Sequence, residues 1–195
     1  MIILIRHGQS TTNQLGLLGG RSNPPLTEQG RDQARRLIPH LLDVKEVWAS
    51  PLERARDTAR LCVPTLEPVI KETFIEVDYG SLDGRPLASI TAEQWREFEG
   101  VHDRPLLDGE SLDAVDQRVY AELDALLADP ESLLHRGDEH LAIVSHVSPI
   151  KAAITWGLGV HGSVAWRMRV DNGSMTVLSS RGAAAMLVRS NVVPL

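Results

Sequence analysis

Residues 1–13 read MIILIRHGQSTTN, and this stretch decides the fold. The unbroken aliphatic run from Met1 to Ile5 is typical of a strand that is buried on both faces in the middle of a parallel sheet. Arg6 and His7 stand at the carboxyl end of this strand, and Gly8 follows at once. Two cationic or near-cationic side chains at the end of a buried strand require an explanation, and the rest of the chain has to supply it.

Strands and helices alternate after this first strand. Apolar residues recur at helical spacing from Thr27 to Leu42, with Thr27 as the predicted N-cap. A short strand over 44–50 comes next and is followed by a helix over 50–63. For this helix, Ser50 as N-cap and Glu53 three positions later predict a capping box. The order of strand and helix predicts parallel strands joined by right-handed crossovers.

The second half of the chain repeats this design. An amphipathic helix is predicted over 111–127. The aliphatic run 141–144 predicts a strand that leads into His146, and a helix is predicted to begin at Ser148. The other predicted features are a capping box of Thr91 with Gln94 and a C-terminal hairpin of 174–179 and 184–188 around Arg181-Gly182.

Length and composition fit one domain with a substantial core, since 43% of the 195 residues are hydrophobic. Together with the alternating elements they predict an α/β fold: three α/β/α layers with a mostly parallel central sheet, in a single domain over residues 1–195. The formal net charge of −6 disfavours nucleic acid or an acidic membrane surface as a partner. Any anion site must therefore be local.

Cysteine usage and hydropathy indicate a cytoplasmic protein. Cys62 is the only cysteine, which excludes an intramolecular disulfide and the usual cysteine route to structural zinc. No apolar stretch approaches the length of a membrane span, and because Met1 leads directly into the first strand, no signal peptide is expected. The sequence shows no heptad seam or self-complementary patch, so it leaves the oligomeric state open, a homodimer included.

The carboxyl ends of the parallel strands are where such a sheet binds its ligand. Arg6, His7, His146 and Arg54 are all expected at this edge. Four such groups would repel one another without an anion among them, so they indicate a phosphate or a similar dianion. The N-termini of two predicted helices direct N–H groups and positive dipole ends to the same place.

Binding a phosphate is not yet catalysis, because hydrolysis of a phosphate monoester needs rate accelerations of up to ~10²¹. One histidine could attack phosphorus when its other ring nitrogen is held by the backbone. The arginines and the second histidine would then stabilise charge on the transferring group. The leaving oxygen needs a general acid, for which the carboxyl groups of residues 75–84, IEVDYGSLDG, are candidates.

Separated motifs in this order make the sequence resemble the histidine phosphatase superfamily, in the branch that includes cofactor-dependent phosphoglycerate mutases and their phosphatase relatives. The resemblance covers nearly the whole chain and implies a phosphoglycerate mutase-like fold. The motifs are Arg6-His7-Gly8-Gln9-Ser10 with Asn13; Leu26-Thr27-Glu28 with Gly30; Ser50-Pro51-Leu52 with Arg54; Glu76 with Gly80 and Gly84; Gly109-Glu110-Ser111 with Arg118; Val144-Ser145-His146; and Asn172-Gly173-Ser174.

The resemblance also implies roles for the site residues. His7 corresponds to the histidine that becomes phosphorylated, and the family's spacing favours Glu76 over Asp78 as the proton donor. The motif residues that would bind and stabilise the phosphoryl group are Arg6, Arg54, His146 and Asn13.

Further residues are predicted at the edges of the site. Ser10 stands where threonine is commoner in the family, and it either binds phosphate or only caps the helix after the first strand. Val147 stands where the family often has glycine, which leaves its backbone amide available to phosphate. Arg21, Ser22 and Glu110 are expected to line the entrance, a prediction that rests on loop position.

The leading hypothesis is a metal-independent phosphatase that acts on small phosphorylated metabolites and uses no cofactor. A metal at the two histidines is disfavoured because the adjacent arginines would repel a cation. A phosphoglycerate mutase is the alternative, although the Gly-Asn that such mutases carry after the second histidine is absent here. A phosphate-binding protein without turnover is less favoured, because a binder needs no proton donor.

The identity of the substrate depends on a variable segment near residues 85–108. This segment, which includes Trp95, Phe98 and His102, is expected to form a partial cover over the pocket. Trp95 and Trp166 are predicted to fill the core or cover helices rather than to bind an aromatic ligand. The sequence does not identify the phosphorylated substrate.

Overall fold

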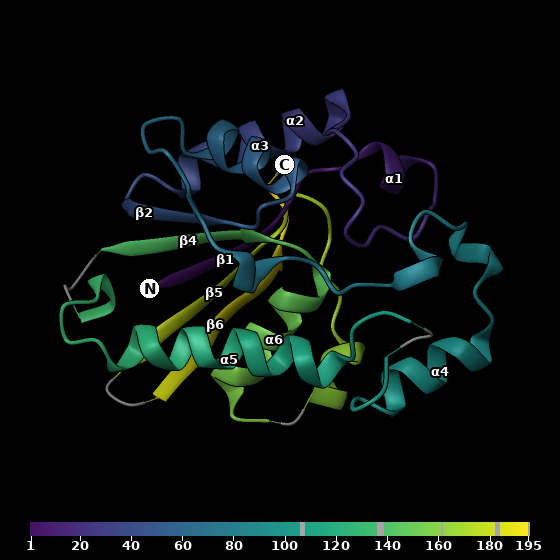
Figure 1. The fold of residues 1–195 in the computed structure, drawn as a ribbon. Coiled ribbons are helices and arrows are strands. Elements are labelled where there is room, and N and C mark those ends of the chain that lie inside the picture. The colour runs from purple at the N-terminus through teal and green to yellow at the C-terminus, as the bar shows by residue number, and fades with distance from the viewer. Residues whose placement is uncertain (106–107, 136–138, 161, 182–183, 195) are drawn as a thin grey trace.

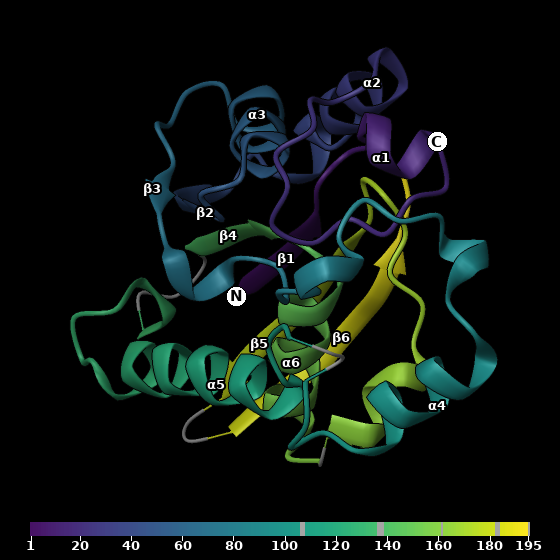
Figure 2. The same ribbon diagram turned by 45° about the vertical axis from the view of Figure 1, so that its right-hand side comes forward.

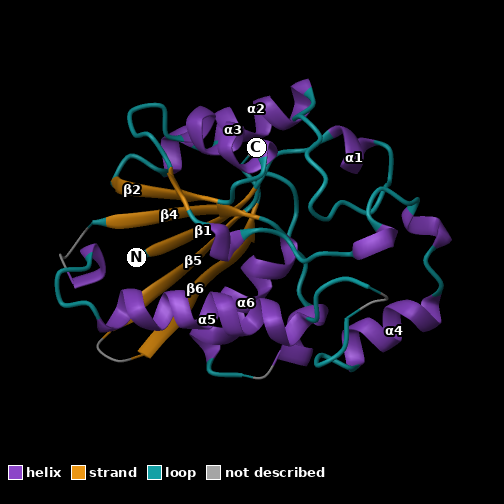
Figure 3. Ribbon diagram, viewed as in Figure 1, coloured by secondary structure: helices purple, strands orange, loops and turns teal. Residues whose placement is uncertain are grey.

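The computed structural model describes residues 1–105, 108–135, 139–160, 162–181 and 184–194. A six-stranded sheet with the strand order β3-β2-β4-β1-β5-β6 runs through its middle (Figure 3). The strands are β1 (Ile2–Arg6), β2 (Val44–Ala49), β3 (Val69–Ile70), β4 (His140–Ser145), β5 (Met175–Arg181) and β6 (Ala184–Val192).

The sheet is mixed, with its parallel part on one side of β1. Strands β3, β2, β4 and β1 pair in parallel, whereas β5 and β6 join as antiparallel strands. The predicted C-terminal hairpin is confirmed as β5 and β6, and residue 182 of its predicted turn lies outside the described residues. The ladder places Arg6 opposite Ser145, so the carboxyl ends of β1 and β4 lie side by side.

Helices cover both faces of the sheet, as predicted for three layers. In Figures 1 and 2, α2 and α3 lie on one face, and α5 and α6 lie on the other. Alternate side chains of β1 supply the two cores: Ile3 and Ile5 pack towards α2 and α3, and Ile2 and Leu4 towards α5 and α6. The helices are α1 (Thr11–Gln14), α2 (Glu28–Arg36), α3 (Glu53–Cys62), α4 (Ala92–Gly100), α5 (Leu112–Ala128) and α6 (Val147–Leu158).

Two predicted helices differ at their ends. Helix α2 begins after the N-cap Thr27 as predicted, but it stops at Arg36 instead of Leu42. Residues 38–40 form a 3₁₀ helix that contains Pro39, which cannot continue an α-helix. Helix α3 begins at Glu53 with Leu52 as N-cap, so the predicted Ser50 cap is wrong.

The capping box of Thr91 with Gln94 at the start of α4 is confirmed. Helix α4 belongs to the segment predicted to cover the pocket, of which residues 106 and 107 lie outside the described part. It lies on the side of the molecule towards which β1 and β4 run (Figure 1). Among the described residues, no helix is long and apolar enough to cross a membrane.

Candidate active site

The carboxyl ends of β1 and β4 bring together the two histidines that the sequence singled out. The ring centroids of His7 and His146 lie 5.0 Å apart, and both side chains are buried. The backbone N–H of His7 donates to the carbonyl of Ser145 at 3.0 Å, which continues the ladder between the two strands into the site. From α3, Arg54 donates its Nε–H to His7 Nε2 at 3.2 Å.

The glycine after His7 is required by a close approach of two backbones. A Cβ at Gly8 would lie 2.1 Å from the carbonyl oxygen of Gly30, and a Cβ at Gly30 would lie 2.1 Å from the carbonyl oxygen of Gln9. The loop that follows His7 therefore packs directly on the first turn of α2. The N–H of Gly8 also donates to Thr58 Oγ1 at 3.1 Å, which ties the loop to α3.

The ring of His7 is held with one nitrogen available to react. Its Nδ1 lies 2.7 Å from the carbonyl oxygen of Gly8, so Nδ1 carries the proton and Nε2 carries the lone pair that Arg54 contacts. Burial lowers the pKa of His7 well below its ordinary value, and the positive charges of Arg54 and Arg6 lower it further. His7 is therefore a neutral imidazole at neutral pH.

His146 is held by a residue whose role the sequence did not reveal. Its Nε2 lies 2.7 Å from Ser50 Oγ, which also accepts a hydrogen bond from the N–H of Leu52. Ser50 Oγ has one proton that it can donate to His146 Nε2, an arrangement that places the imidazole proton on Nδ1. Among the described residues, the buried Nδ1 has no hydrogen-bond partner.

Ser50 holds His146 instead of capping α3 because its backbone is still part of the sheet edge. Its N–H donates to the carbonyl of Val144 on β4 at 3.0 Å, and the helix begins only at Glu53. The pKa of His146 lies well below its ordinary value through burial and then through the charge of Arg54.

Two guanidinium groups give the site its positive charge. Arg54 is 2% exposed, and it donates to the carbonyls of Ser22 at 2.7 Å and Gly20 at 2.8 Å. Burial lowers its pKa to about 10, so it is still charged at neutral pH. Arg6 donates to the carbonyl of Val170 at 2.7 Å. Neither arginine appears in an ion pair among the described residues, which leaves their charge for an anionic ligand.

Glu76 lies at the N-terminus of α6. Its Oε2 accepts from the N–H of Val147 at 3.1 Å, and its Oε1 accepts from the N–H groups of Ser148 at 3.2 Å and Val77 at 2.9 Å. In this structure the Val147 amide donates to Glu76, so its role in binding phosphate stays a prediction. The side chain of Glu76 is buried and its carboxylate is oriented by the helix end.

Ser10 and Asn13 lie beside the histidines as a capping pair. Ser10 is the N-cap of α1 and forms a capping box with Asn13. Asn13 Oδ1 accepts from the backbone and hydroxyl of Ser10 and from Asn172 Nδ2, each at 3.0–3.1 Å. These bonds orient the amide so that its Nδ2 hydrogens are the part that can donate to a ligand.

Most of these groups meet in one pocket of about 200 Å³, but His146, which is fully buried, is not among the residues that line it. Most of the predicted site residues line this pocket, and aromatic and aliphatic residues that were not predicted there complete the lining. It is lined by Arg6, His7, Ser10, Asn13, Leu17, Leu18, Gly19, Arg54, Glu76, Tyr79, Leu87, Trp95, Val147 and Trp166.

Three residues predicted at the entrance do not line this pocket. Glu110 accepts from Arg21 at 3.1 Å and from Arg118 Nε at 3.0 Å, and Arg118 in turn donates to the carbonyl of Ile75 at 2.7 Å. Ser22 contributes its carbonyl to Arg54. Arg21, Ser22 and Glu110 thus hold the loops around the site, a distinction that loop position alone could not make.

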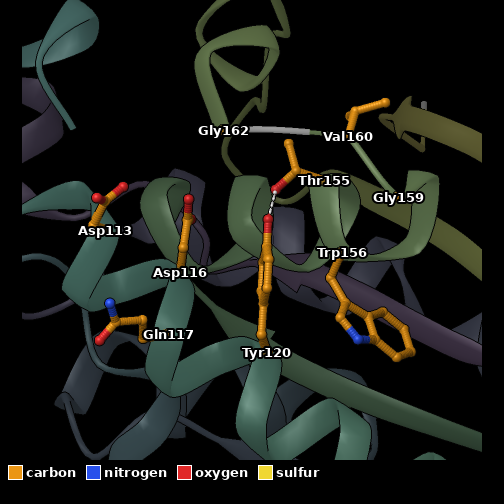
Figure 4. A pocket seen from close by; sticks show the side chains of 9 residues that line it. All are labelled: Asp113, Asp116, Gln117, Tyr120, Thr155, Trp156, Gly159, Val160 and Gly162. Carbon is orange, nitrogen blue, oxygen red and sulfur yellow. Dashed lines mark hydrogen bonds between the residues drawn. The ribbon is translucent and has the colours of Figure 1, made fainter. Parts of the chain in front are cut away.

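A larger cavity of about 440 Å³ lies elsewhere, between α5 and the C-terminal end of α6 (Figure 4). Asp113, Asp116 and Tyr120 are on its α5 side, and the Tyr120 hydroxyl lies 2.8 Å from Thr155 Oγ1. Among the described residues, the ligand atoms of His102, Asp113 and Asp116 come within 4.8 Å of one another. We assign no ion to this group, since partly exposed acidic clusters are common and it contains neither site histidine.

The two buried histidines predict a pH dependence of stability. Their pKa values are depressed in the folded chain, so below the ordinary value of 6.5 the unfolded chain takes up protons that the folded chain does not. The stability that comes from keeping these two histidines neutral is fully present above that pH and is lost progressively below it. We expect the free energy of unfolding to fall by up to about 1.4 kcal/mol per pH unit for each histidine. Urea titrations in phosphate-free buffer between pH 7.0 and 5.5 measure it.

The matched variants are His7→Gln and His146→Gln, each of which should remove about half of this slope. The exposed His40 provides the control, since His40→Gln should leave the slope unchanged. A slope that survives in both buried-histidine variants would contradict the assignment.

Comparison with known proteins adds a family and relatives. A family model described as "Histidine phosphatase superfamily (branch 1)" matches residues 2–193. Phosphoserine phosphatase 1 of Hydrogenobacter thermophilus is 29% identical over 98% of this chain and 92% of its own length. A probable phosphoglycerate mutase of an Enterobacter species is 32% identical over 90% of this chain and 82% of its own.

A solved structure shows the same fold. Phosphoserine phosphatase from Entamoeba histolytica, in complex with phosphoserine, superposes with a TM-score of 0.85 and covers 98% of this chain and 96% of its own. The two sequences are 23% identical, so this likeness concerns the fold.

Proposed function

The chain belongs to the histidine phosphatase superfamily, branch 1, as a phosphoric monoester hydrolase, and we propose that it hydrolyses small phosphorylated metabolites through a phosphohistidine on His7. The observation that carries this proposal is the ring of His7. Its Nδ1 proton is held by the Gly8 carbonyl, and its Nε2 carries a lone pair. Arg54 and Arg6, which form no ion pair among the described residues, place their positive charges beside this ring.

In the first half of the reaction, His7 Nε2 attacks phosphorus. An incoming phosphate takes over the hydrogen bond that Arg54 Nε donates to His7, so the arginine moves its charge onto a phosphoryl oxygen. Arg6 and the Nδ1–H of His146 stabilise the remaining oxygens. The N–P bond forms while the ester P–O bond breaks, and Glu76, which enters this step as the protonated carboxylic acid, gives its proton to the leaving oxygen.

In the second half, water replaces the alcohol. Glu76, now a carboxylate, accepts a proton from this water, whose oxygen attacks phosphorus. The N–P bond breaks, phosphate leaves, and His7 returns to its neutral form with Nδ1 still bonded to the Gly8 carbonyl. Each step uses groups of this chain, and no metal ion or organic cofactor takes part in the proposed sequence.

Hydrolysis and phosphoryl transfer between two positions of one substrate share the first half-reaction. The likeness to a probable phosphoglycerate mutase makes the mutase the alternative to test. The experiment incubates the enzyme in excess EDTA with phenyl phosphate and, separately, with 3-phosphoglycerate, and it measures released phosphate and 2-phosphoglycerate.

Phosphate release that survives EDTA is the expected result. Isomerisation of 3-phosphoglycerate faster than phosphate release would favour the mutase. Loss of all turnover in EDTA, with recovery on addition of one metal, would overturn the metal-independent mechanism.

A further inference from the structure

The wall of the active-site pocket consists of two chemically different sets of residues. The charged and polar set, which includes Arg6, His7, Arg54 and Glu76, is used by the phosphoryl group. The other set has no charged side chain: it comprises the aliphatic Leu17, Leu18 and Leu87, and an aromatic wall that we define as Tyr79, Trp95 and Trp166.

One buried residue holds the whole aromatic wall in place. Phe98 is 2% exposed, and its ring centroid lies 5.8 Å from that of Tyr79, 6.3 Å from that of Trp95 and 5.7 Å from that of Trp166. The contact with Trp166 is edge-on at 62°, a favourable arrangement of two aromatic rings. The three pocket-lining rings are thus members of one packed cluster.

The wall is assembled from segments that are distant in sequence. Trp95 and Phe98 lie on α4, whereas Trp166 lies on the 3₁₀ helix η6 (Gly162–Arg167), which contacts α4. Lys151 of α6 places its ammonium 3.7 Å from the centroid of the Trp166 ring and is itself buried. This cation–π contact adds a second constraint on Trp166 without placing Lys151 among the residues that line the pocket.

Such a wall suits one kind of leaving group. A small polar alcohol would lose water contacts against the ring faces and aliphatic carbons, which replace few of its hydrogen bonds, and this is unfavourable. A flat apolar group would stack on the rings, and its removal from water is favourable. The pocket volume of about 200 Å³ is smaller than a drug-sized site and fits a phosphate with one ring.

Resting on the proposed function, we infer that the substrates are phosphate monoesters whose alcohol carries an aromatic or other flat apolar group seated on Tyr79, Trp95 and Trp166. The prediction that Trp95 and Trp166 serve only packing is therefore revised. Phe98 acts as a positioning residue, because it contacts the wall and does not line the pocket.

The test compares benzyl phosphate with phosphoserine, because both release an alcohol whose oxygen is attached to a CH₂ group and needs similar help to leave. The wild type is expected to have a kcat/KM for benzyl phosphate at least about 30-fold higher. Trp166→Ala should reduce this ratio about tenfold, the order expected for one aromatic contact. Trp166→Phe should retain most of the preference.

Trp156→Ala is the matched control, since Trp156 is a residue of α6 that lines the other cavity (Figure 4). The ratio should be unchanged in this variant. A wild type that prefers phosphoserine, or a ratio that Trp166→Ala does not lower, would overturn the inference.

A binding experiment keeps the inference separate from the proposed reaction. Tryptophan fluorescence titrations should show benzylphosphonate binding at least about tenfold more tightly than methylphosphonate, and Trp166→Ala should abolish the difference. If no ester is hydrolysed, the proposed function fails, but this difference in affinity still tests whether the aromatic wall binds an aromatic group. Equal affinity of the two phosphonates for the wild type would refute the aromatic subsite.

Discussion

His7→Ala is expected to reduce phosphate release from phenyl phosphate by more than about 10⁴-fold, since it removes the nucleophile on which the covalent route depends. The remaining groups would still bind phosphate, because Arg54 is held by the carbonyls of Ser22 and Gly20 independently of His7. Affinity for inorganic phosphate should therefore change far less than turnover. Steady-state assays in EDTA and phosphate titrations measure the two quantities.

Rapid quenching adds a direct test of the intermediate. The wild type should form an acid-labile, alkali-stable phosphoprotein from radiolabelled substrate, and His7→Ala should form none. The exposed His40 offers a control, because His40→Ala should leave both turnover and labelling unchanged. Labelling that persists in His7→Ala would move the nucleophile to another residue.

Glu76→Gln is expected to lower turnover of alkyl phosphates by about 10²- to 10⁴-fold, the usual contribution of a general acid. The loss should be smaller for p-nitrophenyl phosphate in the phosphorylation step, because its leaving group departs without a proton. The amide also replaces one carboxylate oxygen with a donor, where Val147, Ser148 and Val77 all present N–H groups. Some loss of stability is therefore expected, and a thermal melt measures it separately.

Asp78→Asn is the matched control for Glu76→Gln. Asp78 belongs to the same segment, but its side chain is 39% exposed and pairs with Arg21 at 3.5 Å. Turnover of both kinds of ester should remain within about threefold of the wild type, as for an exposed ion pair. Equal losses in the two variants, with the same dependence on the leaving group, would contradict the role proposed for Glu76.

The sequence could predict the parts of the site that follow directly from strand ends. Arg6, His7 and His146 were placed together because parallel buried strands must end at one edge of the sheet. It could not predict that Ser50 would hold His146, because a serine before proline reads equally well as a helix cap. Only the ladder bond from Ser50 to β4 decides between the two.

The sequence pattern could not predict hydrogen bonds between residues that are far apart in the chain. The carboxylate of Glu76 accepts a hydrogen bond from the Val147 N–H, although the two residues are 71 positions apart. No local sequence feature of Val147 predicts this bond. Trp166 likewise lies in a segment without a motif, and it lines the pocket through the packing of η6 against α4 and α6. Spatial neighbours of this kind depend on tertiary packing, for which a single sequence carries no periodic signal.

The two sets of pocket residues also differ in their resistance to local opening. His7 and His146 follow β1 and β4, central strands with a paired neighbour on each side, and such strands exchange their amide hydrogens only on near-global unfolding. Trp95 and Trp166 lie on α4 and η6, outside the sheet. Low concentrations of urea should therefore make the enzyme less selective before they make it inactive, so substrate choice and chemistry have separate thermodynamic thresholds within one pocket.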